Sequence, residues 1–351
     1  MRIIVTGGGG FIGSHVVDAL VANGHDVSVF DSFDPAVHGA RPEYLNSAAR
    51  YFDADITDEA ALDAALRGAD AVSHQAAMVG HGRGATDAPT YVRVNDLGTA
   101  VLLRAAARAG VGRIVLASSM VVYGEGSYRC LEHGPQRPPA RLASDMRARR
   151  FDPTCPACGA ALEPEPITEE AALDPRSVYA ATKVHQEHLA FAVMRSGGPP
   201  VTALRYHNAY GPRMPRDTPY AGVASTMRSE TAAGRPPRVF EDGRQLRDFV
   251  HVRDVARANV LALERHEPAI GAFNVGSGEP HTILDLAVTL SAELAGPTPV
   301  VTGEWRPWDV RHVFASGSRA RRILAYEAAI PFGVGIREFA RAQLRVAVQA
   351  R

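Results

Sequence analysis

Three side chains in the middle of the sequence could move a proton at an alcohol: Ser119, Tyr179 and Lys183. Tyr179 and Lys183 are four residues apart, so they point to one face if their segment is a helix. A phenol ionises near pH 10, so nearby positive charge must lower its pKa by about three units for it to act as a base near neutrality. Lys183 would supply such charge, and Ser119 would donate to the same substrate oxygen.

The first sixty residues predict elements that would position such a site. An apolar run at residues 3–5 leads into glycines, and a helical apolar pattern follows over residues 11–20. Gly24 ends that helix, and DVSVFD at residues 26–31 predicts a second strand. A strand, helix and strand in this order imply a parallel sheet with helices on both faces.

A glycine-rich turn joins the first predicted strand to the first helix. Gly7, Gly10 and Gly13 form the pattern G-x-x-G-x-x-G. Glycines there let a pyrophosphate approach the backbone N–H groups at the helix N-terminus, where the helix dipole favours negative charge. Asp31, at the end of the second strand, would bind a ribose diol and repel a 2′-phosphate. The turn therefore predicts a dinucleotide site that prefers NAD to NADP. An oxidised nicotinamide bound there would join Lys183 in supplying the positive charge that Tyr179 needs.

The fold class that follows is α/β, with a Rossmann-like, doubly wound parallel sheet over most of residues 1–200. Asp55 and Ile56 follow a third predicted strand and would touch the adenine, although Asp55 is equally suited to cap a helix. Residues 201–351 are expected to form mainly a smaller substrate-binding lobe, with residues 246–278 returning to the border of the sheet. The ligand would lie beyond the carboxyl ends of the strands.

Composition and charge exclude several classes of protein. Of 351 residues, 46% are hydrophobic and 22% are charged, which is ordinary for a globular protein of one large or two joined domains. The absence of a long apolar run or a signal-peptide pattern predicts a cytoplasmic protein that does not bind membranes. Lys plus Arg and Asp plus Glu both number 38, so net charge gives no reason to expect nucleic acid as a partner.

The glycine spacing and a series of later motifs resemble the extended short-chain dehydrogenases/reductases, the family of NAD-dependent nucleotide-sugar epimerases and dehydratases. The matching segments span nearly the whole chain: HQAA (74–77), VNDLGT (94–99), ASSMVVYG (117–124), YAATK (179–183), LRYHNAYGP (204–212), RDFVHVRDV (247–255) and FNVGSG (273–278). The resemblance implies that Ser119, Tyr179 and Lys183 are catalytic. Within the matched segments it also implies that the cofactor contacts Phe11, Ile12, Ala76, Asn95, Ser118, Tyr179 and Lys183.

One departure from the family indicates which reaction to expect. Sugar 4,6-dehydratases of this family resemble one another in an Asp-Glu pair directly after the position of Ser119, where this chain has Met120 and Val121. Two apolar side chains cannot eliminate water, so an epimerase, an isomerase, is expected. Tyr179 would take the O4 proton while a hydride leaves C4 for NAD⁺, and the hydride would return to the other face of the 4-keto sugar. A keto-sugar reductase and a non-catalytic, cofactor-binding regulatory protein are the alternatives.

The resemblance also assigns residues to a nucleotide-diphosphate sugar. Asn208 and Arg247 match the family's phosphate and pyrophosphate contacts, and Arg306 with Asp309 matches a pair that holds phosphate and ribose. Arginine suits a diphosphate because its planar guanidinium donates two parallel hydrogen bonds. The family usually has glycine where this chain has Trp308, which sets the last pair somewhat apart from the pattern.

A long segment separates Ser119 from Tyr179. It spans about sixty residues, about twice what the connection needs, so residues 128–167 are predicted to be an insertion beside the site. The segment is rich in Pro and Arg and lacks apolar periodicity, so we expect it to form no core of its own. A lobe of this kind requires another source of stability.

All three cysteines of the chain lie in this insertion, together with a histidine at matching spacing. Cys130-x-x-His133 and Cys155-x-x-Cys158 form two knuckles that predict a closed, tetrahedral and structural Zn²⁺ site. A redox pair at Cys155 and Cys158, or unliganded thiols, are the alternatives. A thioredoxin-like pair opens a helix after a strand, whereas DPTCPACGAAL predicts a loop.

The insertion and the segment DVRH at residues 309–312 resemble the dTDP-L-rhamnose 4-epimerases more than the UDP-galactose 4-epimerases. The reaction so implied interconverts dTDP-L-rhamnose and dTDP-6-deoxy-L-talose. Epimerisation of UDP-glucose or UDP-glucuronate is the alternative, since such sugars differ by one or a few polar groups. Helices around residues 93–109 and 177–195 pair across a dimer in this family, so a homodimer is expected. His207 is left without a predicted role.

Overall fold

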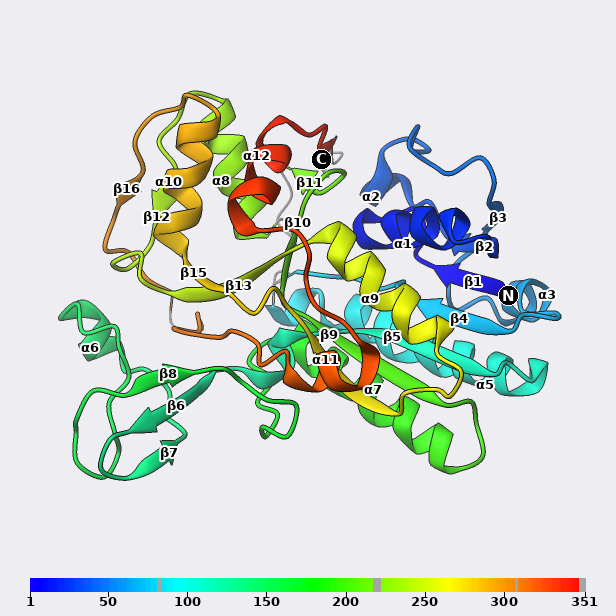
Figure 1. Ribbon diagram of the computed structural model, residues 1–351, viewed down its shortest axis with the longest axis horizontal. Helices are drawn as coiled ribbons and strands as arrows, with labels where there is room; N and C mark the ends of the chain where they lie inside the picture. The colour runs from blue at the N-terminus through cyan, green and yellow to red at the C-terminus, as the bar shows by residue number, and fades with distance from the viewer. Residues whose placement is uncertain (81–83, 217–221, 307–308, 347–351) are drawn as a thin grey trace.

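The computed structural model describes residues 1–80, 84–216, 222–306 and 309–346 (Figure 1). Its largest element is a seven-stranded parallel sheet in the order β14-β9-β5-β4-β1-β2-β3. The strands are β1 (Arg2–Thr6), β2 (Asp26–Asp31), β3 (Arg50–Asp53), β4 (Ala71–His74), β5 (Arg113–Ser119), β9 (Val201–Tyr206) and β14 (Gly271–Val275). The order reverses beside β1, so the predicted doubly wound, Rossmann-like sheet is confirmed.

Helices cover both faces of this sheet (Figure 1). One face carries α1 (Phe11–Ala22), α9 (Val252–Glu264) and α11 (Ser318–Leu324). The other carries α3 (Glu59–Ala65), α5 (Gly98–Ala109) and α7 (Val178–Arg195). Alternate residues of one strand face opposite layers, because Ile3 and Val5 pack in the first layer and Ile4 packs in the second. No described helix is both long and apolar enough to cross a bilayer.

Short elements complete the loops at the carboxyl ends of these strands. They are α2 (Pro35–His38), η1 (Gly84–Thr86), α4 (Ala88–Tyr91), the π-helical η2 (Val92–Leu97) and η3 (Met120–Tyr123). Because η2 runs directly into α5, the helix expected around residues 93–109 is continuous but begins with a wider turn. The expected helix around residues 177–195 corresponds to α7, which Ser177 caps by accepting a hydrogen bond from the Ala180 N–H at 3.1 Å.

A smaller lobe lies beside the large sheet. Its strands are β10 (Asn208–Tyr210), β11 (Pro215–Arg216), β12 (Arg238–Val239), β13 (Leu246–His251), β15 (Pro280–Thr282), β16 (Val300–Val301) and β17 (Arg345–Val346). Its helices are α8 (Val223–Ala232), α10 (Ile283–Glu293) and α12 (Phe332–Arg341). These helices bury one apolar cluster that includes Met227, Leu286, Leu290, Ile336 and Phe339. Residues 246–278 begin in the small sheet at β13 and end in the large sheet at β14.

The predicted insertion forms a third unit at one edge of the molecule (Figure 1). It contains an antiparallel sheet of β6 (Ser127–Cys130), β7 (Gly134–Gln136) and β8 (Glu163–Glu165), together with α6 (Ala143–Arg147). The expectation that it forms no core of its own is wrong, since Tyr128, Cys130, Cys155 and Leu162 make a small buried cluster. These residues come from two distant segments, and therefore no periodicity in the sequence announces them.

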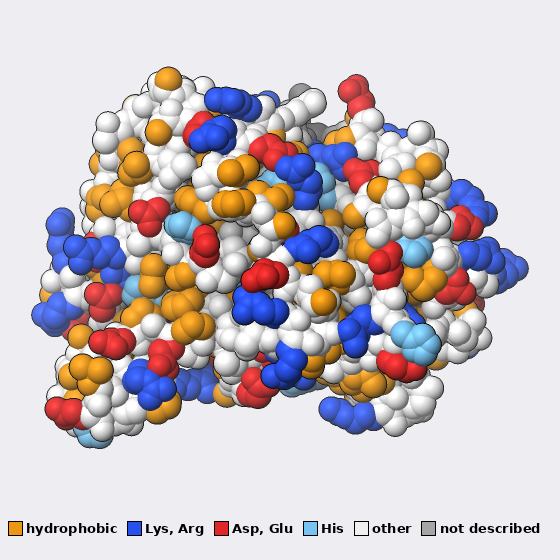
Figure 2. Space-filling model, viewed as in Figure 1, with side chains coloured by type: hydrophobic (Ala, Val, Ile, Leu, Met, Phe, Trp, Pro, Cys, Tyr) orange, Lys and Arg blue, Asp and Glu red, His pale blue; other side chains and the backbone are white. Residues whose placement is uncertain are grey.

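The surface carries both signs of charge. Figure 2 shows Lys and Arg interspersed with Asp and Glu over one face of the molecule, including the insertion. Equal numbers of basic and acidic residues in the sequence agree with this mixture. Recognition of an anionic ligand must therefore come from a local grouping of side chains and not from the field of the whole protein.

Candidate active site

The carboxyl end of β5 and the first turns of α7 bring the three predicted catalytic residues together. Ser119 is the last residue of β5, and its side chain forms a hydrogen bond with Tyr179. Lys183 lies one turn further along α7, with its Nζ 5.9 Å from the centre of the Tyr179 ring. The Lys183 ammonium donates to the carbonyl oxygen of Ala117 at 2.8 Å. The arrangement can bind an alcohol oxygen between a hydroxyl and a phenol.

Burial controls the protonation of this pair. It raises the pKa of Tyr179 to about 12, and the hydrogen bond with Ser119 offsets only part of that rise. Burial also lowers the pKa of Lys183 to about 8, against the attraction of Glu187 and Asp96. Lys183 therefore does not lower the pKa of Tyr179 by itself, which leaves the charge of an oxidised nicotinamide as the other expected contribution. Lys183 does not offset the burial of the phenol, although an ammonium with a pKa of about 8 is still mostly charged at pH 7.

A buried ion pair that the sequence analysis missed lies behind these residues. Glu187 follows Lys183 by one turn and accepts from Arg205 at 2.9 and 2.7 Å, and both side chains are almost fully buried. Glu187 also accepts from the hydroxyl of Ser118, and Arg205 donates to the Tyr123 hydroxyl at 2.9 Å. The pair ties β5, α7 and β9 together. The sequence offers one indication of Glu187, since it follows Lys183 by four positions and so lies on the same face of α7.

The glycine turn has the close backbone contacts that the sequence predicts. Gly7 has a φ of +67°, and a Cβ there would lie 2.6 Å from the Ala76 backbone nitrogen. A Cβ on Gly13 would lie 2.1 Å from the Gly7 carbonyl oxygen. The Gly10 N–H donates to that same oxygen at 3.0 Å, and Phe11 begins α1. Only glycine leaves this turn tight and its N–H groups accessible to a phosphate.

Asp31 lies against this turn at the end of β2. Its carboxylate accepts from the backbone N–H groups of Gly9 and Phe33, each at 2.9 Å, and lies 3.6 Å from His38. Burial opposes its ionisation, but the bonds from His38, Phe33 and Gly9 outweigh burial and lower the pKa of Asp31. Each carboxylate oxygen accepts more than one hydrogen bond, so an ionised Asp31 can still bind a diol.

The other residues assigned to the cofactor have different surroundings. Asp55 accepts from the Thr57 N–H at 2.9 Å and from Arg93 at 3.0 Å, whereas Asp58 caps α3. The alternative that Asp55 caps this helix is therefore wrong, since the cap lies three positions further along the chain, at Asp58. Ile56 is buried below the start of α5, and Ile12 is half-buried in the first turn of α1.

Asn95 has a side chain that is fully engaged. Its amide binds both the N–H and the C=O of Met78, at 2.8 and 3.0 Å, and donates to Thr182 at 2.9 Å. It thereby ties the loop after β4 to α7, beside Lys183. Ala76 lies in the same loop, where its N–H donates to Thr6 at 3.2 Å. The structure places Asn95 as a support for this loop and Ala76 against the glycine turn.

The predicted nucleotide-sugar residues lie around the junction of the two lobes. The Asn208 Oδ1 is buried and has no partner among the described residues. Arg247 is half-buried and donates to the carbonyl oxygens of Leu246, Val310 and Arg311 at 2.7 to 2.9 Å, which occupies three of its five N–H groups. The structure therefore leaves Arg247 with two N–H groups for a ligand.

Arg306 and Asp309 lie on either side of residues 307–308. The Arg306 guanidinium lies 4.7 Å above the centre of the Phe240 ring. Asp309 is half-buried, and its backbone carbonyl accepts from Arg141 of the insertion. Trp308, at which the chain departs from the family pattern, lies outside the described residues.

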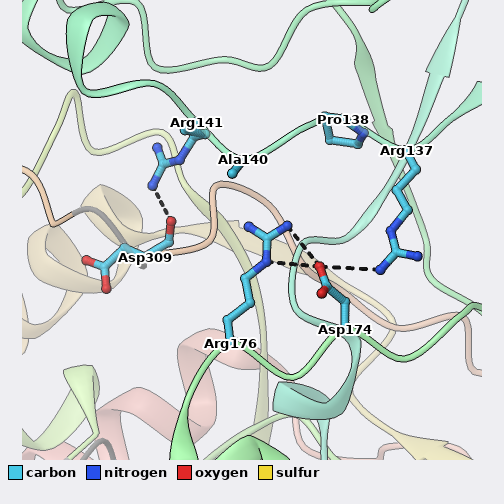
Figure 3. Close-up of a pocket in the computed structure, with 7 residues that line it drawn as sticks. All are labelled: Arg137, Pro138, Ala140, Arg141, Asp174, Arg176 and Asp309. Carbon is cyan, nitrogen blue, oxygen red and sulfur yellow. Dashed lines mark hydrogen bonds and ion pairs between the residues drawn. The ribbon is translucent and has the colours of Figure 1, made fainter. Parts of the chain in front are cut away.

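A cleft of about 520 Å³ lies between the insertion and the loop that leads into α7 (Figure 3). Arg137, Pro138, Ala140 and Arg141 of the insertion line one side, and Asp174 and Arg176, with Asp309, line the rest. Arg176 precedes Tyr179 by three positions, so the cleft adjoins the loop that leads into the first turn of α7, where Tyr179 lies. The sequence analysis missed Arg137 and Arg141 because their partners, Asp174 and Glu241, come from distant segments.

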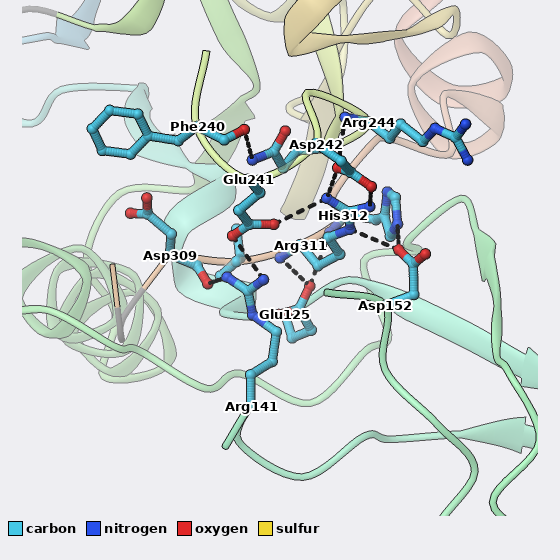
Figure 4. Close-up of polar contacts among 12 residues, drawn as sticks. Glu125, Arg141, Asp152, Phe240, Glu241, Asp242, Arg244, Asp309, Arg311 and His312 are labelled. Atoms are coloured by element: carbon cyan, nitrogen blue, oxygen red, sulfur yellow. Dashed lines mark hydrogen bonds and ion pairs between the residues drawn. The ribbon is translucent and has the colours of Figure 1, made fainter. Parts of the chain in front are cut away.

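Arg311 of the DVRH segment joins three parts of the molecule (Figure 4). Its side chain is fully buried and donates to Asp152 of the insertion at 2.7 Å. It also donates to Glu241 at 2.9 Å and to Asp242 at 2.6 and 2.9 Å, both in the smaller lobe. Glu125, close after β5, accepts from the Arg311 N–H at 2.8 Å. The insertion is thus fixed in place by buried charge.

His207 is buried near this junction. Neither of its ring nitrogens has a hydrogen-bond partner among the described residues. Burial lowers its pKa, against the attraction of Asp248. His207 is therefore a neutral imidazole that precedes Asn208, whose Oδ1 is also without a partner within the described chain.

The four predicted metal ligands converge in the insertion. Their ligand atoms all lie within 4.8 Å of one another. The Cys130 sulfur lies 3.5 Å from His133 Nδ1 and 3.7 Å from the Cys158 sulfur, and the Cys155 sulfur lies 3.8 Å from His133 Nδ1. In a tetrahedral site with Zn–S bonds of about 2.3 Å, neighbouring sulfurs lie about 3.8 Å apart. The spacing therefore suits one tetrahedral ion.

Comparisons with known proteins agree along most of the chain. The sequence model of the "NAD dependent epimerase/dehydratase family" matches residues 3–141 and 153–276. The chain is 34% identical to the dTDP-L-rhamnose 4-epimerase of Burkholderia thailandensis over 321 residues, which cover 89% of this chain and 86% of that protein. Similar solved structures include the UDP-glucose 4-epimerase of Thermus thermophilus in complex with NAD (TM-score 0.77, 29% identity, 97% of this chain and 98% of that one). A second is the UDP-glucuronic acid 4-epimerase of Bacillus cereus with UDP-glucuronic acid and NAD (TM-score 0.79, 26% identity, 97% and 98%).

The buried charges at Arg311 give a first prediction. Replacing Arg311 with methionine removes the partner of Asp242 and one of the two arginine partners of the buried Glu241, so the free energy of unfolding in urea should fall by about 3–5 kcal/mol at pH 7. The control Arg321→Met removes an exposed ion pair with Glu327 and should cost less than about 1 kcal/mol. A loss no greater than that of the control would contradict the role given to Arg311.

The difference in the free energy of unfolding between wild type and Arg311→Met should depend on pH. Bonds from His312 and Arg311 hold the pKa of Asp152 below its usual range, and for Asp242 the bond from Arg311 outweighs the effect of burial and lowers its pKa as well. A carboxylate with a lowered folded-state pKa stabilises the fold above its unfolded pKa of about 4 and loses that contribution as pH falls. The gap between wild type and Arg311→Met should therefore narrow below pH 4, and an unchanged gap would contradict the account.

Proposed function

The chain belongs to the NAD dependent epimerase/dehydratase family, and from this premise we propose that it inverts C4 of a dTDP-6-deoxyhexose, interconverting dTDP-L-rhamnose and dTDP-6-deoxy-L-talose. Its class is that of the NAD-dependent nucleotide-sugar epimerases. The observation that carries the proposal is the arrangement of Ser119, Tyr179 and Lys183 at the end of β5, beside the glycine turn and the cleft. Met120 and Val121, which follow at once, offer no acid or base for elimination.

The chain's own residues suit a dinucleotide at the glycine turn. A Cβ on Gly7 or Gly13 would collide with backbone atoms, so the turn is built for close approach of another group. When bound there, NAD⁺ supplies a hydride acceptor for C4 and a positive charge near the phenol. Asp31 is positioned to bind the adenine-side ribose.

Proton transfer then falls to Tyr179 and Ser119. Tyr179 receives the proton of the substrate O4 and returns it after the sugar has turned over, while Ser119 donates a hydrogen bond to that oxygen. The chain alone holds the pKa of Tyr179 at about 12, so its ionisation depends on positive charge that arrives with the ligands. Tyr179 would therefore act as a base only when the ligands are bound.

Two features favour a 6-deoxy sugar over a uronate. The relative in Burkholderia thailandensis, 34% identical, is a dTDP-L-rhamnose 4-epimerase. In addition, the half-buried Met120 and Val121 present an apolar surface directly after Ser119. Such a surface suits a methyl group at C6, whereas a carboxylate there would lose hydration without a charged partner from these two residues.

The proposed reaction is tested with the purified protein and no added NAD. Incubation with dTDP-L-rhamnose should yield its C4 epimer by NMR, with no steady rise in absorbance at the NADH band. Tyr179→Phe should lower kcat by about 10²- to 10⁴-fold, because the proton acceptor is lost. The control Tyr326→Phe, in which the removed hydroxyl donates to the Gly276 carbonyl, should retain kcat.

Three outcomes would overturn parts of this proposal. Faster turnover of UDP-glucose or UDP-glucuronate would refute the sugar but leave the class intact. Steady NADH formation would indicate a net oxidoreductase, such as a keto-sugar reductase. A lack of turnover with every nucleotide sugar would favour a non-catalytic regulatory protein.

We also propose that Cys130, His133, Cys155 and Cys158 hold a structural Zn²⁺. Three thiolates and one imidazole are ligands that zinc prefers, and the four donor atoms are close enough for one ion. All four positions of a tetrahedron would be filled, which favours a structural over a catalytic metal. The ion would join the β6–β7 hairpin to the loop at residues 155–158 and so hold the insertion together.

Metal analysis tests this site without any assay of activity. The purified protein should contain about one zinc per chain, and Cys158→Ser should lose most of it, because Cys158 is an exposed ligand that can be replaced with little effect on packing. The control His266→Ala, which changes a histidine far from the cluster, should keep its zinc. Chelation should also lower the melting temperature of the wild type. A metal-free protein with a Cys155–Cys158 disulfide would contradict the proposal.

We further propose a homodimer that pairs η2, α5 and α7 across a two-fold axis. Val92 and Leu97 are about half exposed on η2, which leaves apolar surface beside α5. Light scattering should give the mass of a dimer for the wild type and of a monomer for Leu97→Glu. The control Leu131→Glu, which changes an 82% exposed leucine on the insertion, should stay dimeric. A monomeric wild type would refute the assembly.

A further inference from the structure

We propose that Arg137 of the insertion binds the diphosphate of the nucleotide sugar, so that the insertion supplies one wall of the substrate site. This inference rests on the proposed function and extends it to a residue that neither the family motifs nor the comparisons assign. It concerns the cleft of about 520 Å³ in Figure 3, where Arg137 and Arg176 converge on one carboxylate.

Two guanidinium groups share Asp174 in this cleft. Arg137 Nη2 lies 3.3 Å from Asp174 Oδ2, and Arg176 Nη2 lies 3.0 Å from the same oxygen. Because Arg137 shares Asp174 with Arg176, its guanidinium can also bind a second anion. Arg137 is 58% exposed and faces the cleft, whereas Arg176 is 25% exposed and also lies 3.8 Å from Glu125.

The other arginines near the cleft are largely committed to the protein. Arg247 uses three of its N–H groups on backbone carbonyls, and Arg141 donates to Glu241 at 2.8 Å and to the Asp309 carbonyl. A diphosphate carries two or more negative charges and needs several donors. Of the arginines that line this cleft, Arg137 therefore has the most N–H groups free to meet a ligand.

The backbone around Arg137 is held rigidly at the edge of the cleft. Arg137 precedes Pro138 and Pro139, which restrict the chain to an extended conformation. Arg141, at the other end of this short segment, is anchored to Glu241 by an ion pair with both side chains buried. A guanidinium on such a segment loses little backbone freedom on binding, which favours its use in recognition.

The buried junction of Figure 4 explains why the wall stays in place. Arg311 binds Asp152 of the insertion and Asp242 of the smaller lobe at once. Arg141 of the insertion also pairs with Glu241, so the insertion cannot move away from the cleft without breaking an ion pair whose side chains are both buried. Residues of the DVRH segment thus position the insertion, and Arg137 makes the contact to the ligand.

Titration calorimetry with the NAD-loaded protein tests the contact. Arg137→Ala and Arg137→Gln should each weaken binding of dTDP about tenfold or more and weaken binding of dTMP, which lacks the second phosphate, distinctly less. Turnover of dTDP-L-rhamnose should show a raised KM with kcat within about twofold of wild type. The control Arg129→Ala removes an exposed arginine of the same lobe that pairs with Glu165, and it should bind dTDP as the wild type does.

The outcomes separate this inference from the proposed function. Wild-type affinity for dTDP in both Arg137 variants would overturn the inference, whatever sugar is turned over. Equal weakening by Arg129→Ala, or equal weakening of dTDP and dTMP, would also overturn it, because the effect would then not come from a contact to the diphosphate. If the wild type binds dTDP but epimerises no dTDP-sugar, the proposed function fails while the calorimetry still decides the role of Arg137.

Discussion

The desolvation of Tyr179 is the constraint on which the rest of the site depends. A half-buried phenol without a charged partner stays protonated, and burial raises the pKa of Tyr179 to about 12. Lys183 lies close by, but burial lowers its pKa to about 8. Its ammonium donates a hydrogen bond to the carbonyl oxygen of Ala117. The folded chain therefore positions the groups for the proposed proton transfer. The positive charge that would ionise Tyr179 has to come from the bound cofactor. A base of this kind is inactive until the site is complete.

Buried ion pairs maintain that geometry at two levels. Glu187 and Arg205 join β5, α7 and β9, the elements next to Tyr179 and Lys183, and Arg311 joins the insertion to the smaller lobe. Such pairs are costly to desolvate and add specificity more than stability, because the fold tolerates no arrangement in which one partner is left alone. These ion pairs explain how the insertion, which has only a small apolar cluster, can line the cleft of Figure 3.

Much of the fold followed from patterns that are local in the sequence. The glycine turn, the alternation of strands and helices, and the four-residue spacing of Tyr179 and Lys183 each lie within one or two elements. The convergence of Cys130 with Cys158 was also predictable, since metal ligands reveal themselves by type and spacing. Local patterns did not predict the small sheet of the insertion, the partners of Arg311 or the direction in which the chain shifts the pKa of Tyr179. Each depends on burial or on partners from distant segments, which no local pattern records.

The central claim is that C4 is inverted by removal and return of the same hydride while the sugar stays bound. The most direct measurement uses dTDP-L-rhamnose that carries deuterium at C4, with NMR and mass spectrometry of the product. The account predicts that the C4 epimer keeps its deuterium at C4, and that unlabelled substrate gains none from deuterated water. Loss of the label to solvent, or uptake of solvent deuterium at C4, would contradict it, since either would mean that C4 is inverted through a proton and not through a hydride.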